Sequence, residues 1–224
     1  MHGRPSALLD LVRTAGPAVE PVDLAAIKRQ VNAEEFDDDD TLLQDKLDTA
    51  IQELDGYTGR LGRCLVEQTW VLHLERFPGS GFSHRLFRHP LHRAIHLPMP
   101  PLIGVDGIAY LDTTGATQVL DPATYTVVDG PRALVQLKAG QSWPFTLWDA
   151  RAVSITFRAG FAAKGADPAP DPADVPAPLR NWIQLRAAEL YANREGRVIV
   201  DSRATLIENP VMDDLLSLYM ADFL

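Results

Sequence analysis

Hydrophobic residues in the first quarter of the chain recur at spacings of three and four, which is the period of a helix with one buried face. In residues 22–32 this stripe consists of Leu24, Ile27 and Val31, and Asp23 stands where a helix cap is expected. A second stripe ends at the glycines of DGYTGR and contains Leu43, Leu47, Ala50, Ile51 and Leu54. We therefore predict two amphipathic helices in this part of the chain.

The period then changes to two, as in a strand with one buried side. In VEQTWVLHLERF the residues Val66, Trp70, Leu72 and Leu74 alternate with mostly polar neighbours. Similar short runs follow, separated by Gly, Asp and Pro: LIGVDGIAYLD, TYTVVDG, RALVQL and RAVSITFRAGF. We predict that residues 65–161 form an all-β module.

A proline-rich stretch, residues 162–175, follows this module and has the composition of a stiff, extended linker. A third helix is expected from Pro178, a residue that suits the first turn, to the NREG stop. Its apolar stripe is Leu179, Trp182, Ile183, Ala187, Leu190 and Tyr191. Residues 22–64 and 176–196 thus form a helical core into which the β module is inserted.

The two ends of the chain are predicted to be extended arms. Residues 1–21 form the N-terminal arm, in which SALLDLVRT has the composition of a short helix before the Gly16-Pro17 break. Residues 197–224 form the C-terminal arm and close with a helix. Its apolar face consists of Val211, Leu215, Leu218, Tyr219 and Phe223. The predicted fold class is α+β: a small helical bundle, an inserted all-β module and two arms.

Composition narrows the range of functions. The chain has 224 residues, 46% of them hydrophobic, and a formal charge of -9, so the molecule as a whole does not attract a nucleic-acid backbone. One cysteine, Cys64, excludes an internal disulfide and a cysteine-rich zinc site. The N-terminal sequence lacks the apolar core of a signal peptide, and no stretch is long and apolar enough for a membrane span. We expect a soluble protein made in the cytoplasm, with no membrane partner.

The acidic run EEFDDDD, residues 34–40, stands at the start of the second predicted helix. Carboxylates there interact favourably with the helix dipole and with free amide groups, so a capping role is the simplest interpretation. A Ca²⁺ loop needs alternating ligands, a central Gly and a distal Glu, and that pattern is absent. A weak divalent-ion site and an acidic docking face are the remaining alternatives.

Residues 81–96, GFSHRLFRHPLHRAIH, are here called the His-Arg strip. The strip is basic within an acidic protein and contains Arg85, Arg88, Arg93, His89 and His92. It is either an exposed hairpin loop or a contact with an acidic partner or a DNA backbone. A zinc site is a third alternative, but the histidine spacing lacks a carboxylate or Cys partner. We predict, as a hypothesis, that these residues belong to an interface with a partner.

Nothing in the sequence indicates an enzyme. There is no nucleophile elbow and no phosphate-binding loop, and Cys64 has no nearby His. We therefore predict no catalytic residue, no cofactor and no metal. Trp70 and Trp182 fall on the apolar phase of their elements and are expected in the core, whereas Trp143 and Trp148 lie in the loop QSWPFTLWD and could be exposed.

The order of these motifs resembles that of the head-tail connector (adaptor) proteins of long-tailed phages and of phage-like gene transfer agents. The resemblance covers about residues 22–196. It rests on a helix that ends in GYTGR and is followed by QTW, the proline turn LPMPPL, the loop GQSWP, and a last helix that begins at a proline and ends in YANRE. Each motif alone is weak, but their collinear order is specific.

The resemblance implies a structural virion protein at the head-tail junction of a phage or gene transfer agent particle, assembled in the cytoplasm of the bacterial host. Its copies would form a ring, typically of twelve, between the portal protein and a stopper or other tail-side component. DNA would pass through the ring without sequence-specific binding. The competing hypothesis is a monomeric β-type module that binds a carbohydrate or an anionic ligand on a tail or cell surface.

Overall fold

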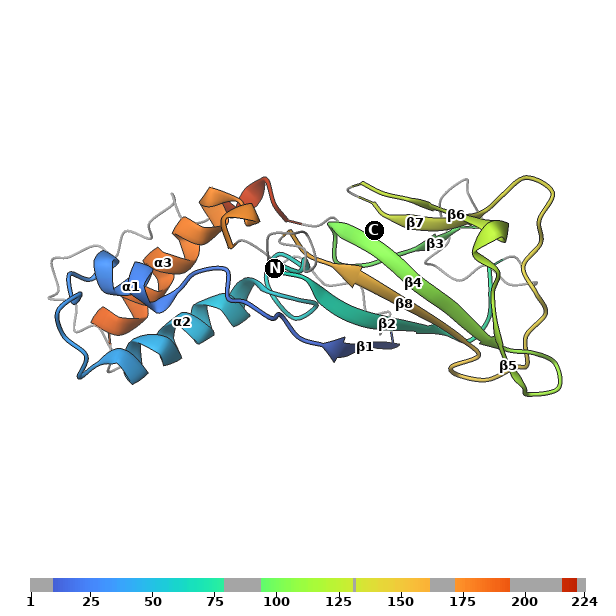
Figure 1. The fold of residues 1–224 in the computed structure, drawn as a ribbon, viewed down its shortest axis with the longest axis horizontal. Helices are drawn as coiled ribbons and strands as arrows, with labels where there is room; N and C mark the ends of the chain where they lie inside the picture. Colours follow the sequence, from blue (N-terminus) through green and yellow to red (C-terminus); the bar gives the residue numbers. More distant parts are fainter. Residues whose placement is uncertain (1–9, 79–93, 131, 162–171, 194–214, 221–224) are drawn as a thin grey trace, which may run out of the picture.

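The computed structural model describes residues 10–78, 94–130, 132–161, 172–193 and 215–220. Helices gather at one end of an elongated molecule and strands at the other (Figure 1). The helices are α1 (Leu24–Gln30), α2 (Asp40–Leu54) and α3 (Ala177–Ala192), and short 3-10 turns cover Pro122–Thr124 and Pro172–Asp174. The mixture of helix and sheet confirms the predicted α+β class.

All three predicted helices are present, and their stripes meet in one core. Asp23 caps α1, because its side chain accepts a 2.7 Å hydrogen bond from the backbone of Ala26. Arg186 of α3 makes an ion pair of 2.9 Å with Glu53 of α2. The buried residues of the three helices include Ile27, Leu43, Leu47, Ala50, Leu54, Leu179, Trp182, Ile183 and Ala187. Trp182 is therefore a core residue, as predicted.

Two antiparallel sheets enclose a second core. The larger has the order β1-β2-β8-β4-β5, and the smaller β3-β7-β6. The strands are β1 (Asp10–Ala15), β2 (Gln68–Leu74), β3 (Ile95–His96), β4 (Leu102–Leu111), β5 (Thr117–Val119), β6 (Tyr125–Val128), β7 (Leu134–Leu137) and β8 (Val153–Ala159). Burial alternates along β2, where Trp70 and Leu72 face the core. Burial alternates in the same way along β8, and the other runs predicted as strands fall on β4, β6 and β7.

The helix predicted for SALLDLVRT is wrong for the part that the structure describes. Residues Asp10–Ala15 form β1, which pairs antiparallel with β2 from Asp10 opposite His73 to Ala15 opposite Thr69. A helix this short is marginal by itself. The open edge of β2 offers a row of hydrogen-bonding groups, and pairing with it outweighs local helix preference. These residues of the predicted arm are therefore part of the larger sheet.

The end of α2 and the start of β2 are joined by a tight turn around GYTGR. The backbone N–H of Gly56 donates to Arg63, and that of Arg60 donates back to Glu53. Gly59 lies so close to the end of α2 that a Cβ there would stand 2.2 Å from the carbonyl oxygen of Leu54. Only glycine fits this approach, so the turn fixes how the helices are connected to the sheet.

Candidate partner interface

The C-terminal segment, residues 215–220, lies against the helical core. Residues 215–217 are helical, and Leu216, 3% exposed, is buried among the core residues of the three helices. Leu215 and Tyr219 are partly buried on the same core. The guanidinium of Arg63, in the turn after α2, donates to the backbone carbonyl of Tyr219. Leu216 is therefore the buried anchor of the segment, and the hydrogen bond from Arg63 adds a polar contact.

The other side of this segment is apolar and faces outward. Leu218 is 87% exposed and Met220 is 56% exposed. Of the five residues predicted to share one apolar face, Leu215 and Tyr219 point to the core and Leu218 does not. Val211 and Phe223 lie outside the described residues. Leu216, which the sequence pattern missed, is the residue that fixes the segment.

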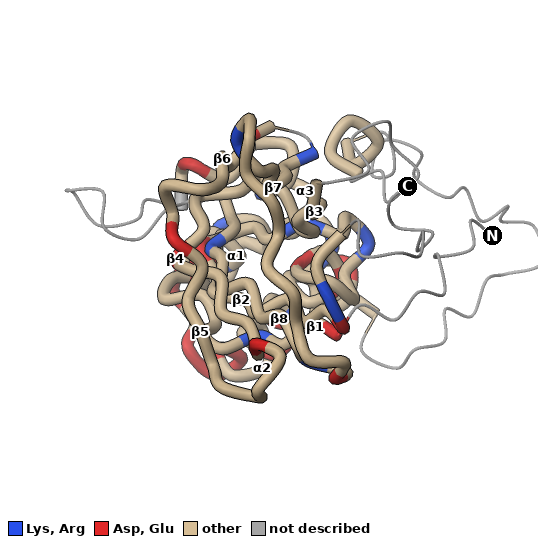
Figure 2. Tube along the Cα trace, turned by 90° about the vertical axis from the view of Figure 1, so that its right-hand side faces the viewer, with Lys and Arg blue, Asp and Glu red and all other residues tan. Residues whose placement is uncertain are grey.

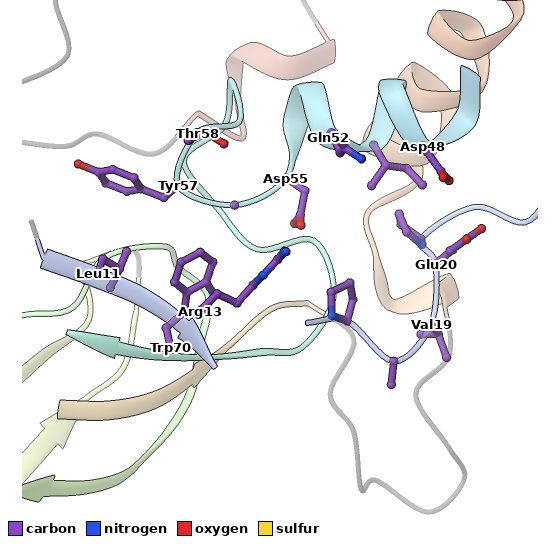
Figure 3. Close-up of a pocket in the computed structure, with 15 residues that line it drawn as sticks. Leu11, Arg13, Val19, Glu20, Asp48, Gln52, Asp55, Tyr57, Thr58 and Trp70 are labelled. Atoms are coloured by element: carbon purple, nitrogen blue, oxygen red, sulfur yellow. The ribbon is translucent and has the colours of Figure 1, made fainter. Parts of the chain in front are cut away.

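A groove of about 900 Å³ runs between β1, the chain that follows it, and the end of α2 (Figure 3). Its apolar lining includes Leu11, Val19, Ile51, Tyr57 and Trp70. Such a mixture of apolar walls and a few polar groups is typical of surfaces that receive a side chain or a ligand. No pattern along the chain indicates this groove, because its walls come from elements that are far apart in the sequence.

Asp55 and Arg13 face one another in this groove, as Figure 3 shows. Asp55 accepts hydrogen bonds from the backbone N–H of Leu65 at 2.8 Å and from Nε2 of Gln68 at 2.5 Å. Burial raises the pKa of the Asp55 carboxyl, while these two hydrogen bonds and the charge of Arg13 act in the opposite direction. The guanidinium of Arg13 also lies over the ring of Trp70, 6.0 Å from its centroid.

Two further carboxylates, those of Glu20 and Asp48, stand together at the other end of the groove (Figure 3). The side-chain amide of Gln44 bridges them, at 3.1 Å from Glu20 Oε1 and 2.9 Å from Asp48 Oδ1. Both residues are exposed. Together with Asp55 they give the groove three carboxylates against the single cation of Arg13. Acidic side chains therefore outnumber basic ones in the lining of the groove.

The loop between β7 and β8 runs along the end of the molecule farthest from the helices (Figure 1). Phe145 is 83% exposed, Trp148 is 76% exposed, and Leu147 is also exposed. Arg76, just after β2, places its guanidinium over the ring of Trp148 at 4.8 Å from the centroid. We call Phe145, Leu147, Trp148 and Arg76 the aromatic tip.

Trp143, in the same loop, is only partly exposed, so the expected exposure is found for Trp148 and not for Trp143. Its ring stacks on Phe77, with centroids 4.7 Å apart and an interplanar angle of 8°, and it is packed against the sheet core. The loop is thus attached at one end and presents its other aromatic residues outward. Figure 2 looks onto this end of the molecule, where acidic and basic positions are both present and neither sign dominates.

The acidic run is only in part a helix cap. Asp39 takes the N-cap position of α2, yet its side chain makes no capping hydrogen bond and instead accepts one from the hydroxyl of Tyr191 in α3. Lys28 of α1, only 8% exposed, makes ion pairs of 2.6 Å with Asp37 and 2.8 Å with Asp40. The hydrogen bonds that the Lys28 ammonium donates to Asp37 and Asp40 raise its pKa. The run therefore connects the three helices electrostatically.

The remaining candidates from the sequence are the His-Arg strip, a metal site and Cys64. Arg85, Arg88, Arg93, His89 and His92 of the His-Arg strip lie outside the described residues. Within the part of the chain that the structure describes, no group of three or more His, Cys, Asp or Glu could hold a metal ion. Cys64 is buried, and burial raises the pKa of its thiol. Among the described helices, none is long and apolar enough to cross a membrane.

Known proteins resemble this chain in structure and not in sequence. No protein-family model matches the sequence, and no curated protein matches it. A chain in a structure described as the virion of a native gene transfer agent particle has a TM-score of 0.68 and 17% identity, over 96% of this chain and 97% of that chain. A chain in the neck of an empty gene transfer agent particle, computed with C6 symmetry, has the same TM-score at 18% identity, over 96% of each chain.

This fold occurs in gene transfer agent particles. A third matching chain is in the neck of a native particle computed with C12 symmetry, with a TM-score of 0.59 and 18% identity over 95% of this chain and 97% of that chain. Because each match covers nearly the whole of both chains, the helical end and the sheets are shared together. With four residues in five different, a shared fold does not transfer any particular contact.

Proposed function

We propose that this chain is a head-tail adaptor of a phage or gene transfer agent particle. In this role its copies form a ring, with twelve members, between the portal protein and a stopper or other tail-side component. The fold match to particle and neck chains over at least 95% of this chain is the observation that carries the proposal. The collinear motifs from GYTGR to YANRE support it independently, since they were identified in the sequence alone.

The charge distribution fits a channel that DNA must pass. A net charge of -9 per copy gives a ring that repels the duplex rather than holding it. Such a ring needs no catalytic group. Its function depends on the shape of the channel and on the surfaces that bind neighbouring subunits and proteins. The site of action is then the head-tail junction of the particle, and assembly takes place in the bacterial cytoplasm.

The C-terminal segment is the part that we assign to portal binding. Its outward side carries Leu218 and Met220, two large apolar side chains in water at the end of a helical core. Single exposed apolar residues are common. Two of them on a short segment that Leu216 holds in place form a preorganised apolar surface for a partner protein. Val211 and Phe223, from the same predicted helix, are proposed to extend it.

The test is the mass of the full chain, alone and mixed with its cognate portal, by light scattering after gel filtration. The adaptor proposal expects a stoichiometric complex of ring mass with the portal. Replacing Leu218 and Met220 by Ser should weaken that complex and leave folding unchanged. The matched control is Phe36→Ser, another exposed apolar residue, which lies at the α1–α2 turn and should have no effect. A chain that ignores the portal under all conditions would contradict the proposal.

The aromatic tip favours a second candidate function, a monomeric module that binds a carbohydrate or an anionic ligand. Trp148 and Phe145 are exposed, as in a stacking platform for sugar rings, and Arg76 supplies a cation. This function expects a monomer whose melting temperature rises with ligand. A ligand screen by thermal shift distinguishes the two, because a ring component has no reason to be stabilised by free sugars.

A further inference from the structure

We infer that the aromatic tip of one copy of this chain docks in the groove of the next copy, and that this contact closes the ring. The inference rests on the proposed function for its setting, but its two surfaces are both present on the described chain. The tip is Phe145, Leu147, Trp148 and Arg76, and the groove lies between β1 and the end of α2. A contact between two different surfaces of the same chain is head-to-tail, which is the kind that generates rings.

The apolar parts of the two surfaces match in chemistry and in size. The groove has a volume of about 900 Å³ and is lined by Leu11, Ile51 and Trp70, among others, so it can receive aromatic side chains. Phe and Trp bury roughly 150–250 Å² each, so Phe145 and Trp148 together supply roughly half of the ~800 Å² that each partner of a stable interface buries. Contacts elsewhere on the ring would supply the rest.

The charges are also complementary. The guanidinium of Arg76 lies over the ring of Trp148. A partner that buries Trp148 therefore also meets the charge of Arg76. The groove holds the carboxylates of Glu20 and Asp48, which are bridged by the neutral amide of Gln44. An arginine that arrives beside two exposed carboxylates gains a charge-assisted contact and fixes the orientation of the tip.

The two surfaces lie towards opposite ends of β2, so one copy can present its tip while its own groove stays open. The part of β2 from Trp70, a groove residue, to Leu74 is about 13 Å long at the rise of a strand, and Arg76 follows two residues beyond the end of β2.

The experiment joins the two surfaces covalently. The double variant Thr146→Cys with Gln52→Cys places one thiol in the tip loop, beside Phe145, and one in the groove, without removing an aromatic residue. Cys64 is buried and will not compete. Under mild oxidation the double variant should give a ladder of covalent multimers on a non-reducing gel, and each single variant should stay monomeric.

Other outcomes have defined meanings. Dimers from Thr146→Cys alone would show that tips meet each other, and no cross-link within a portal complex of ring mass would show that the tip faces another component; either overturns the inference. If no portal complex forms, the adaptor proposal fails, but the concentrated chain still tests the contact: a ladder there supports it and its absence overturns it.

A charge exchange gives a second measurement that needs no cross-link. Arg76→Glu and Asp48→Arg should each lower the amount of assembled ring at least several-fold, and the double variant should recover assembly. Asp45→Arg is the matched control for Asp48, because it reverses an exposed charge on the same helix outside the groove lining. If the double variant assembles no better than the single variants, the two positions do not meet and the inference is overturned.

Discussion

The side-chain amide of Gln68 donates a 2.5 Å hydrogen bond to the carboxylate of Asp55, at the point where α2 ends and the chain turns into β2. The same carboxylate accepts from the backbone N–H of Leu65. One acidic side chain thus serves both the helical core and the larger sheet. Leu65 and Gln68 reach the Asp55 carboxylate because the GYTGR turn brings the chain that follows it back to the end of α2.

Replacing Asp55 distinguishes its hydrogen bonds from its charge. Asp55→Ala leaves Leu65 N–H and the Gln68 amide without their acceptor and should cost about 1–3 kcal/mol of stability. Asp55→Asn should cost less, because Oε1 of Gln68, which has no partner among the described residues, can accept from the new amide after a flip. Urea unfolding of both variants measures the difference. Equal losses would show that the charge matters more than the hydrogen bonds.

The turn after β4 predicts a defined loss of stability in acid. Asp112 accepts from Thr114, Ala116 and Gln118, and these hydrogen bonds lower the pKa of its carboxyl from 3.8 to about 2. A lowered pKa means that the carboxylate stabilises the fold fully above its unfolded pKa. That contribution is lost as the pH falls from about 4 towards 2. Asp112→Ala should flatten this part of a stability-against-pH curve and lower stability at pH 7. A curve of unchanged shape would contradict the assignment.

The close approach at Gly59 makes a sharp prediction. Gly59→Ala places a methyl group 2.2 Å from the carbonyl oxygen of Leu54, so the backbone must move, at a cost of about 2–3 kcal/mol or more. Gly107→Ala is the matched control, since nothing lies within 4 Å of its Cβ position, and it should change stability little. Thermal unfolding followed by circular dichroism measures both. A stable Gly59→Ala protein would mean that the turn adapts.

Leu216 should decide whether the C-terminal segment stays on the helical core. Leu216→Ala removes a buried side chain and should cost about 2 kcal/mol in the attachment of residues 215–220. Hydrogen exchange of amides in this segment should then become faster, while that of α2 is unchanged. Leu218→Ala, at an exposed position two residues further on, should leave exchange as it was. Faster exchange in both variants would show that the segment is held by other contacts.

Lys28 should be needed for the stability of the fold, because two carboxylates lie beside its ammonium group. Lys28→Met leaves Asp37 and Asp40 close together without their cation, and the melting temperature should fall. Adding Asp37→Asn and Asp40→Asn to that variant should restore part of the loss, because the repulsion is removed. The wild-type melting temperature should also fall with added salt more than that of the triple variant. No recovery in the triple variant would contradict this account.

The sequence by itself determined what short-range patterns control. The stripes of Leu43 and Leu47 in α2, or Leu179 and Ile183 in α3, repeat within a few residues, so each helix and its buried face could be predicted. The alternation in β2 predicted that Trp70 is buried, and the loop composition predicted that Trp148 could be exposed. These features depend on the period of a single element, which neighbouring residues fix.

Tertiary structure alone decided the pairings between distant residues. Nothing in SALLDLVRT shows that Asp10–Ala15 will meet the edge of β2, and nothing in the acidic run shows that Lys28 will lie between Asp37 and Asp40. The groove was hidden for the same reason, since Leu11, Asp48 and Trp70 come from three elements. Such contacts depend on how whole elements pack in space, and packing is decided by the sum of many weak interactions rather than by any local pattern.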